Sequence, residues 1–396
     1  MKQLLLPFCL VALTASAQQT IHSVSNGAAT NPFIWDCTCF PSTNDIVIVD
    51  HQVTMNVDWA ITAGGRIEVS NGASLIQDQD RQLLVDGAGS QLIINGTATF
   101  TDIAFTNGAS GSNAGLFSVD RGLYFAAGTD FTNTSGINGI DSLLTEGTFT
   151  NSGTFQAGNF LNTGNFTNTG EIGCDSMGNT GLFDSNGGYL ALATFGNTGT
   201  FSMANQGFMS VASNWYNAGD FTIAVGLQVF VSGNAYTGDT LGGTANLFNN
   251  GALVVTGDFA NSDNVSGSGD ICIGNDSYNV GSITGTIDFC DNTGGDFDVN
   301  LGTIAGTVTT CVSGCGLGIN EDETHFTLFP NPATVQLFIE SNIVFEKAHF
   351  YNLAGELVQV TPISANAIEL NALNAGIYFV QLIGETNSAV VRVVIQ

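Results

Sequence analysis

A repeat governs the fold of this chain. Aligned Gly-x-Phe segments place one apolar residue every 17 to 20 positions, in the series Phe131, Phe149, Phe166, Phe183, Phe201, Phe221, Leu241 and Phe259. An Asn-x-Gly turn precedes four successive members, at residues 162–164, 179–181, 197–199 and 217–219. Self-similarity at a nearly fixed period is typical of a solenoid, in which each structural unit stacks on the one before it.

A finer spacing indicates what each unit contains. Glycines at 147, 153, 158, 164 and 170 divide one repeat into about three short segments, each the length of a strand and a turn. No proline lies between Pro41 and Pro330, as expected of a backbone whose N–H groups all serve sheet ladders. The sequence therefore predicts an all-β fold, a parallel β-helix of about 15 coils. Variable coil length is more typical of the right-handed form. A β-sandwich with accidental periodicity is the alternative.

The charge balance excludes one large class of function. Lys and Arg number 6 against 34 Asp and Glu, and no Lys, Arg or His lies between Arg121 and His325. Affinity for nucleic acid comes from Lys and Arg that displace counterions from phosphates, so a nucleic-acid partner is excluded.

The first residues have the order of a secretory signal peptide. Lys2 precedes an apolar run at 4–13, and Ala15-Ser16-Ala17 supplies small residues for cleavage. No run reaches the roughly 18 apolar residues of a transmembrane helix. We expect a signal peptide at 1–17, an N-terminal cap with the first coils at 18–60, a solenoid at 61–316, a linker at 317–325 and a second domain at 326–396.

Seven cysteines remain after the predicted cleavage, and export favours disulfides among them. Cys272, Cys290 and Cys311 are spaced by about one coil each, so they are expected on adjacent coils. Either Cys272 pairs with Cys290 and Cys311 with Cys315, or Cys290 pairs with Cys311. A bond between Cys37 and Cys39 would close a strained small ring, and Cys174 is the expected free thiol. The Cys311-x3-Cys315 spacing suggests zinc only weakly, because no His lies near it.

The end of the chain carries three motifs in order. Pro-Asn-Pro-Ala-Thr occupies 330–334, Gly-Glu-Leu-Val occupies 355–358, and Gly-Ile-Tyr occupies 376–378, before a final apolar strand at 390–395. Residues 326–396 resemble the C-terminal sorting domain of the type IX secretion system of Bacteroidetes. The positions assigned to the sorting motif are Pro330, Asn331, Pro332, Gly355, Gly376, Tyr378 and Arg392. Val335 departs from the Asp that the family commonly has, and Arg392 from its Lys.

This resemblance implies a small Ig-like sandwich of about seven strands. It also implies two partners, the type IX translocon and its sortase, and a location that is secreted or attached to the outer-membrane surface. Residues 31–58, with Trp35 and Pro41, resemble the opening of secreted β-helix proteins from the same bacteria.

Candidate chemistry is sparse. His22, His51, Arg66, Arg81 and Arg121 are the only bases and cations of the predicted solenoid, and Asp45, Asp50 and Asp58 lie near His51 in sequence. Asp296, Asp298 and Asn300 offer oxygen ligands for calcium, the one cofactor considered, although the glycine of an EF-hand loop is missing. Three functions remain open: a structural or adhesin-like rod that contacts a surface glycan or protein, a β-helical lyase or glycosidase, and an ice-binding array of threonines. The last has least support, because the positions beside the phenylalanine series include Asp184, Ser202, Gly242 and Ala260.

Overall fold

A computed structural model describes residues 17–239, 243–294, 296–311, 326–341, 344–352, 357–364, 366–370, 373–384 and 388–396. Contacts divide the chain into two compact units, Met1–Leu317 and Gly318–Gln396. The described residues contain no α-helix and one 3-10 helix, η1 (Pro32–Ile34). Residues 1–16 of the predicted signal peptide and the whole predicted linker lie outside the described residues.

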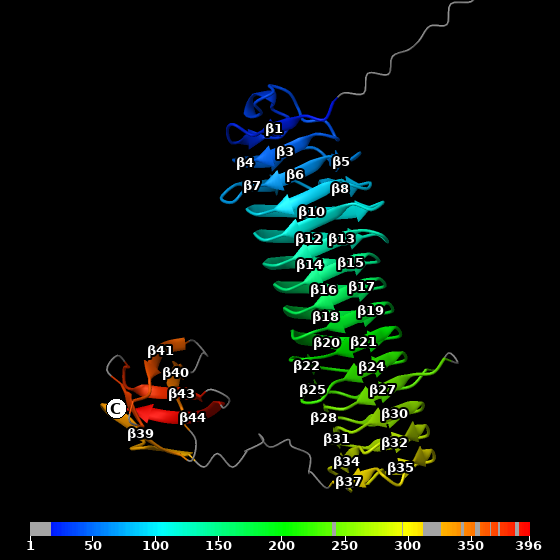
Figure 1. Cartoon of the computed structure of the whole chain (residues 1–396), viewed down its shortest axis with the longest axis vertical. Coiled ribbons are helices and arrows are strands. Elements are labelled where there is room, and N and C mark those ends of the chain that lie inside the picture. The colour runs from blue at the N-terminus through cyan, green and yellow to red at the C-terminus, as the bar shows by residue number, and fades with distance from the viewer. Residues whose placement is uncertain are drawn as a thin grey trace, which may run out of the picture. The chain divides into compact units, whose positions relative to one another are not determined.

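The first unit is a parallel β-solenoid whose successive coils lie one above another (Figure 1). Face 1 is a sheet of 15 strands, one from each coil. Its strands pair in parallel with the coils above and below, so the β-sandwich alternative is wrong for this unit. The strands of face 1 are β1 (Thr20–His22), β3 (Ile46–Val49), β6 (Arg66–Val69), β9 (Gln91–Ile94), β11 (Ser110–Asn113), β13 (Asp130–Asn133), β15 (Thr148–Asn151), β17 (Asn165–Asn168), β19 (Leu182–Ser185), β21 (Thr200–Met203), β24 (Asp220–Ile223), β27 (Asn246–Asn249), β30 (Asn264–Gly267), β33 (Ser282–Ile283) and β36 (Thr303–Ile304).

Two further faces complete each coil. In six coils one long strand runs across both, so the two faces join into one sheet there. The long strands are β10 (Thr97–Thr106), β12 (Leu116–Phe125), β14 (Gly136–Thr145), β16 (Thr154–Asn162), β18 (Glu171–Asn179) and β20 (Tyr189–Asn197). The other strands of face 2 are β2 (Gly27–Ala28), β4 (Gln52–Met55), β7 (Ser74–Gln77), β22 (Phe208–Val211), β25 (Gln228–Val231), β28 (Ala252–Val255), β31 (Asp270–Ile273), β34 (Asp288–Asp291) and β37 (Thr309–Thr310). Those of face 3 are β5 (Trp59–Ile61), β8 (Gln82–Asp86), β23 (Trp215–Asn217), β26 (Ala235–Thr237), β29 (Phe259–Asn261), β32 (Ser277–Asn279) and β35 (Val299–Asn300).

The core of the solenoid contains a stack of phenylalanine rings. The predicted members from Phe131 to Phe221 occupy one inward position of face 1 and pair in register. Between Phe149 and Phe221 neighbouring ring centroids lie 4.6 to 4.9 Å apart and the ring planes differ by 2 to 6°. Each ring therefore packs on an identical ring one coil away, which buries a large apolar area.

The last two predicted members of this series are wrong. Leu247 and Val265 continue it after Phe221. Phe259 lies in face 3, between Ala235 and Ser277, and Leu241 lies outside the described residues. The reason is a longer coil: β27 begins 26 residues after β24, and the extra residues follow β26. Regular spacing cannot reveal such an insertion.

Two columns of buried asparagines mark two corners of the coil. One follows face 1, where Asn113, Asn133, Asn151 and Asn168 are joined by amide hydrogen bonds of 2.7 to 2.8 Å. The other follows face 3, where Asn162, Asn179, Asn197 and Asn217 are joined in the same way. Each Nδ2 also donates to backbone carbonyl groups at its corner, so the ladder satisfies polar groups that burial would otherwise leave unpaired.

The glycine of each Asn-x-Gly turn is required by the spacing of the coils. A Cβ atom on Gly164, Gly181, Gly199 or Gly219 would lie 2.2 Å from the carbonyl oxygen of the glycine one coil before. No side chain fits at that distance. The repeated Asn-x-Gly turn in the sequence therefore records a close backbone contact between these successive coils.

Aromatic side chains close the N-terminal end of the stack. The indole of Trp35 is buried, its Nε1 donates to the Ala29 carbonyl at 2.8 Å, and its ring meets Trp59 edge to face. Phe40 packs on the same Trp59 ring. These contacts cover the first coil, which has only one neighbouring coil.

In the described residues of the second unit there are seven antiparallel strands, as the resemblance implies. One sheet has the order β38 (Phe326–Phe329), β39 (Gln336–Ser341) and β42 (Ala367–Glu369). The other has the order β41 (Leu357–Pro362), β40 (Lys347–Tyr351), β43 (Gly376–Ile383) and β44 (Ser388–Ile395). Leu337 and Ile339, like Val380 and Leu382, are two residues apart, so they lie on one side of their strand, and all four belong to the buried core.

The ladder predicts a steep cost for removing one amide. Asn179 is 1% exposed, accepts from Asn162 and donates to Asn197 and Thr200. Asn179→Ala leaves these groups unpaired, so we expect a loss of about 2 to 4 kcal/mol, measured by urea unfolding. The control is Asn165→Ala on the exposed side of β17, which should leave the unfolding midpoint unchanged. Equal effects of the two substitutions would contradict a structural role for the ladder.

Candidate functional site

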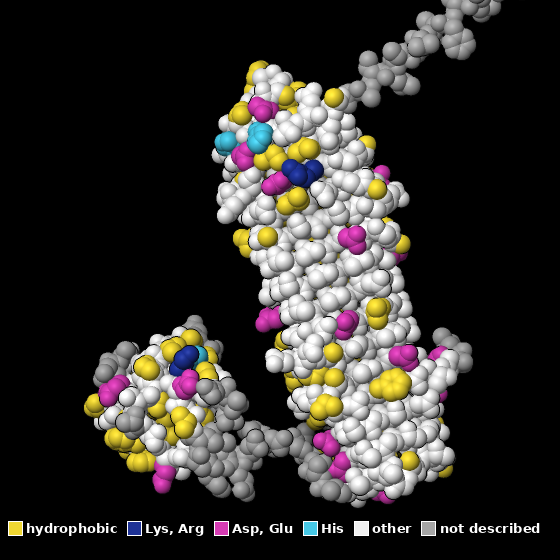
Figure 2. All heavy atoms as spheres, viewed as in Figure 1, with side chains coloured by type: hydrophobic (Ala, Val, Ile, Leu, Met, Phe, Trp, Pro, Cys, Tyr) yellow, Lys and Arg dark blue, Asp and Glu magenta, His cyan; other side chains and the backbone are white. Residues whose placement is uncertain are grey.

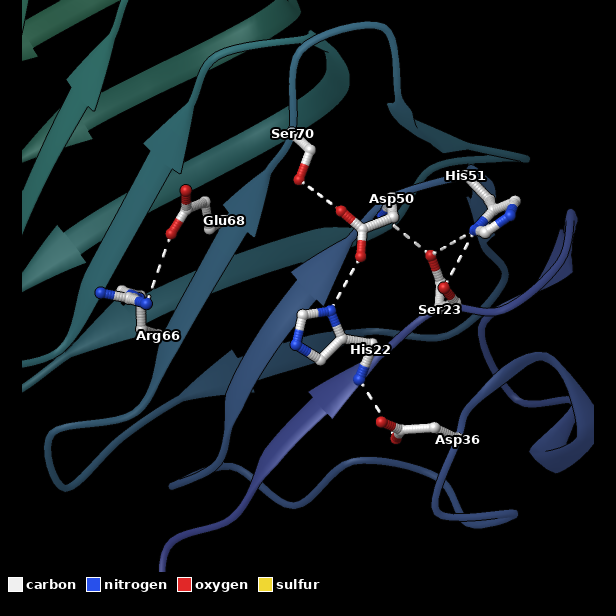
Figure 3. A network of polar contacts seen from close by, with 8 residues as sticks. All are labelled: His22, Ser23, Asp36, Asp50, His51, Arg66, Glu68 and Ser70. Atoms are coloured by element: carbon white, nitrogen blue, oxygen red, sulfur yellow. Dashed lines mark hydrogen bonds and ion pairs between the residues drawn. The ribbon is translucent and has the colours of Figure 1, made fainter.

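Several bases and acids predicted from the sequence meet at the N-terminal end of face 1 (Figure 3). His22 ends β1, Asp50 follows β3 and Ser70 follows β6. The Asp50 carboxylate accepts from Nδ1 of His22 at 2.8 Å and from the Ser70 hydroxyl at 2.7 Å. Hydrogen bonds from His22 and Ser70 lower the pKa of Asp50 below its ordinary value. Since the three residues come from successive coils, this carboxylate joins the first coils of the stack.

A second pair in this network has the residue types of a nucleophile and its base. The Ser23 hydroxyl lies 3.3 Å from Nδ1 of His51, but that nitrogen also lies 2.9 Å from the Ser23 carbonyl oxygen. A nitrogen that donates to a carbonyl group carries its proton and cannot take one from the hydroxyl. Ser23 is 2% exposed, and its hydroxyl accepts the N–H of Asp50. The pair therefore fixes a turn and does not form a nucleophile.

The remaining predicted acids and cations do not converge on this point. Asp45 accepts the N–H groups of Gln19 and Ser42, and Asp58 accepts that of Gln82. Arg66 pairs with Glu68, Arg81 with Asp78, and Arg121 with Asp102 and Asp80. Within the described ranges, no group of three or more His, Cys, Asp or Glu side chains could hold a metal ion.

The three predicted calcium ligands lie in and before β35. The Asp298 carboxylate accepts the N–H of Ser277, and Asn300 Oδ1 accepts from Asn279 Nδ2 in the face 3 column, where the asparagines resume after an interruption at Thr237. Asp296 Oδ1 accepts the N–H of Phe297. Each therefore has an oxygen engaged by a protein donor, and a calcium site here stays a prediction.

The cysteines form two disulfides among the described residues. Of the two pairings expected at the end of the stack, the structure contains Cys290–Cys311, with Cα atoms 4.5 Å apart, and Cys272 pairs in register with Cys290. Cys315 lies outside the described residues. Cys174 is buried and free, and burial raises the pKa of its thiol to about 12.

Cys37 and Cys39, which the sequence offers as disulfide candidates despite the small ring, are bonded to each other. Thr38 between them has a φ of 53°, a left-handed conformation that turns the chain and places the two Cα atoms 5.2 Å apart. Spacing alone does not reveal this turn.

The threonine positions beside the phenylalanine stack face outward and are in register from Thr132 to Thr222. Asp184 and Ser202 interrupt them, and Phe248 follows Thr222. Figure 2 shows a solenoid surface made mostly of backbone and of side chains that are neither hydrophobic nor charged, with scattered hydrophobic and acidic side chains. The uniform threonine array of an ice-binding surface is therefore absent from these positions of face 1.

Sequence reasoning missed a column of tyrosines on the outside of face 3. Tyr216, Tyr236, Ala260 and Tyr278 occupy the same outward position in four successive coils. The rings of Tyr216 and Tyr236 stack with centroids 5.0 Å apart and planes 12° apart. They line a groove of about 570 Å³, together with Ala260, Ser262, Asp239 and other residues of the same corner. The first two tyrosines are 20 residues apart, about one coil, and this spacing could have indicated that they lie in one column.

In the second unit, the predicted Pro-Asn-Pro motif is attached to the last strand. Asn331 Nδ2 donates to the Arg392 carbonyl at 3.1 Å, and its Oδ1 accepts the Val394 N–H at 2.9 Å. The Tyr378 hydroxyl donates to the Asn374 carbonyl at 2.9 Å. Pro330 and Pro332 flank Asn331, Gly376 begins β43, and Gly355 lies outside the described residues. Asn331 therefore ties the first residues of this unit to its last strand.

The Asp50 network predicts pH-dependent order in the first coils. Because the pKa of Asp50 is lowered in the folded state, its stabilisation is complete above its ordinary pKa and disappears as the pH falls through the lowered one. The groups are partly exposed, so the effect is under about 1 kcal/mol. We expect amides of β3 and β6 to exchange faster in Asp50→Asn than in the parent at pH 6, with the difference vanishing at low pH. Asp130→Asn, exposed on the same face, is the control. If the ratio of the exchange rates of Asp50→Asn and the parent did not change with pH, the result would contradict this role.

The Cys290–Cys311 bond is expected to stabilise the coils at the C-terminal end of the solenoid. It closes a loop of 21 residues, so its loss should cost about 3 kcal/mol in the coils that it joins. Hydrogen exchange in the double variant Cys290→Ser/Cys311→Ser should rise at β34 and remain unchanged at β17. The control variant Cys37→Ser/Cys39→Ser should leave β34 protected. Unchanged protection at β34 without the bond would show that the last coil holds without it.

Comparison with known proteins identifies one part of the chain. Residues 327–396 match the family described as the secretion system C-terminal sorting domain. No curated protein and no solved structure matches the chain. Within the described part, no helix is long and apolar enough to cross a membrane. The chain is therefore a secreted β-helical protein that ends in a type IX secretion sorting domain.

Proposed function

We propose that this protein is an adhesin-like rod that the type IX secretion system delivers to the cell surface. The observation that carries the proposal is the stack itself, joined to a sorting domain at residues 327–396. Inward phenylalanines and corner asparagines hold one coil on the next, so the outward side chains of successive coils lie directly above one another. Such a stack presents long, nearly flat faces, which suit contact with an extended partner.

The alternative, a β-helical lyase or glycosidase, has less support. A lyase needs a base next to a cation that neutralises the substrate, yet His22 is held by Asp50 and Arg121 by Asp102. A glycosidase needs two carboxyl groups across the scissile bond. The tyrosine groove of face 3 is lined by one carboxylate, that of Asp239. This groove therefore favours binding over hydrolysis.

Attachment is proposed to follow recognition of the second unit by the translocon and sortase. The exposed Arg392 lies on β44, opposite Phe379 of β43, and Asn331 binds the backbone of the same strand. Asn331 and Arg392 thus lie together at the β44 edge of the sheet, where one partner can contact both, whereas Leu357 and Val358 of the Gly-Glu-Leu-Val motif lie on β41 at the opposite edge.

Deletion of residues 326–396 should abolish surface delivery and leave the solenoid folded in the periplasm, because the two units have separate cores. Surface labelling of intact cells and protease resistance of the periplasmic fraction measure the two outcomes. Asn331→Ala, which loosens the attachment of the motif to β44, should reduce delivery in part. Normal surface levels of the truncated protein would overturn the proposed route.

A further inference from the structure

The tyrosine column of face 3 has a missing ring. Tyr216 and Tyr236 stack directly, and the next position holds Ala260 before Tyr278 resumes the column. Tyr236 and Tyr278 are therefore two coils apart, about 9.6 Å. That separation leaves room above Ala260 for one ring at the spacing that the Tyr216–Tyr236 stack already has.

The two rings that border this gap lean the same way. The Tyr236 hydroxyl accepts from Asn234 Nδ2 at 3.1 Å, and the Tyr278 hydroxyl donates to Asp276 at 3.3 Å. In each case the partner lies two residues earlier in the chain. The gap is therefore a slot between two similarly oriented rings, with the Ala260 methyl group as its floor.

Polar groups lie at both ends of the slot. Asp258 stands two residues before Ala260, as Asn234 does before Tyr236, and its charge helps to raise the pKa of Tyr278, after the larger effects of Asp276. At the opposite end the groove is lined by Ser262 and Asp239. A phenol or phenyl ring has at most one polar end, whereas a pyranose carries hydroxyl groups on opposite edges. The slot therefore suits a sugar ring better than an aromatic side chain.

The charge of the site selects among sugars. Asp239 lines the groove, Asp276 binds the Tyr278 hydroxyl and Asp258 lies near the same tyrosine, while no Lys, Arg or His lies between Arg121 and His325 in the sequence. Carboxylates accept hydrogen bonds from hydroxyl groups but repel uronates and sulfates. The groove of about 570 Å³ is within the usual range for small-ligand sites.

The backbone beside the slot is closely fitted. A Cβ atom on Gly238 would lie 1.8 Å from the Ser262 hydroxyl oxygen. The Asp263 carboxylate accepts the N–H groups of Asp239 and Ala245, on either side of the extra residues of this coil. These contacts hold the Asp239 side of the groove next to the tyrosines.

We infer that the slot between Tyr236 and Tyr278 binds one pyranose unit of a neutral polysaccharide chain, with its ring in the place of the missing tyrosine. This inference rests on the proposed adhesive function and names the partner of one face. The tyrosine rings cover both sides of the sugar, and Asp258, Ser262 and Asp239 accept hydrogen bonds from its hydroxyl groups.

One substitution tests the slot without weakening the solenoid. Ala260→Tyr supplies the missing ring, so it should close the slot and keep or raise the thermal midpoint. The matched control, Ala191→Tyr, adds the same side chain on the outside of face 2, between Gly173 and Ser210. A second variant, Tyr236→Ala, removes one wall. Its control is Tyr189→Ala, which removes an exposed tyrosine that stacks on Phe208 in face 2.

Affinity gel electrophoresis of the full exported chain measures binding to glucan, mannan, galactan and xylan, with alginate and polygalacturonate as anionic probes. We expect retardation by at least one neutral polysaccharide and none by the anionic probes. Ala260→Tyr and Tyr236→Ala should weaken it at least tenfold, and both controls should match the parent.

Three outcomes would overturn the inference: no retardation by any neutral probe, equal retardation by anionic probes, or parental binding by Ala260→Tyr. Each leaves the proposed function standing if deletion of residues 326–396 still abolishes surface delivery. Conversely, normal delivery of the truncated protein together with slot-dependent binding would overturn the route and keep the sugar site.

Discussion

The distance between corner backbones sets the structure of the solenoid. At Gly181 and Gly199 the preceding coil lies so close that a Cβ atom would meet its carbonyl oxygen at 2.2 Å. That contact and the asparagine ladders beside it fix the register of each coil on the last. Once the register is fixed, equivalent positions form columns. The inward column becomes a stack of phenylalanines, and an outward one brings Tyr216 next to Tyr236.

The same columns explain how an acidic chain can form a long stack. A charge repeated in register would face its own copy about 4.8 Å away, which is costly unless a cation intervenes. The ladders instead use side-chain amides, which donate to one neighbour and accept from the other. Outward positions of face 1 are largely Thr, Ser and Asn, with aspartates such as Asp130 and Asp184 on separate coils. On face 1 these aspartates therefore have uncharged residues as their neighbours one coil away.

The sequence was informative wherever one residue type has one role. Phenylalanine in a repeat is buried, and asparagine before glycine marks a corner, so the parallel coils and the inner stack from Phe131 to Phe221 could be predicted. Tyrosine can face either way, and nothing in the spacing of Tyr216 and Tyr236 distinguishes an outward column from a buried one. The network around Asp50 joins residues that spacing does not relate, since His22 and Ser70 are 48 residues apart. The extra residues after Thr237 also shifted the expected series to Leu241.

The position of the Cys290–Cys311 bond has a mechanical consequence. Suppose that the solenoid is held at its C-terminal end and that a polysaccharide bound in the slot pulls on it. The tension then passes only through the coils between β26 and β37, and the coils before β26 carry no load. The backbone hydrogen bonds between successive coils run along the axis of the solenoid. Such a load therefore breaks them one coil at a time, starting from the C-terminal end. The covalent bond links β34 to the coil that follows it, at the end of this load path. It therefore lies where peeling under tension would begin.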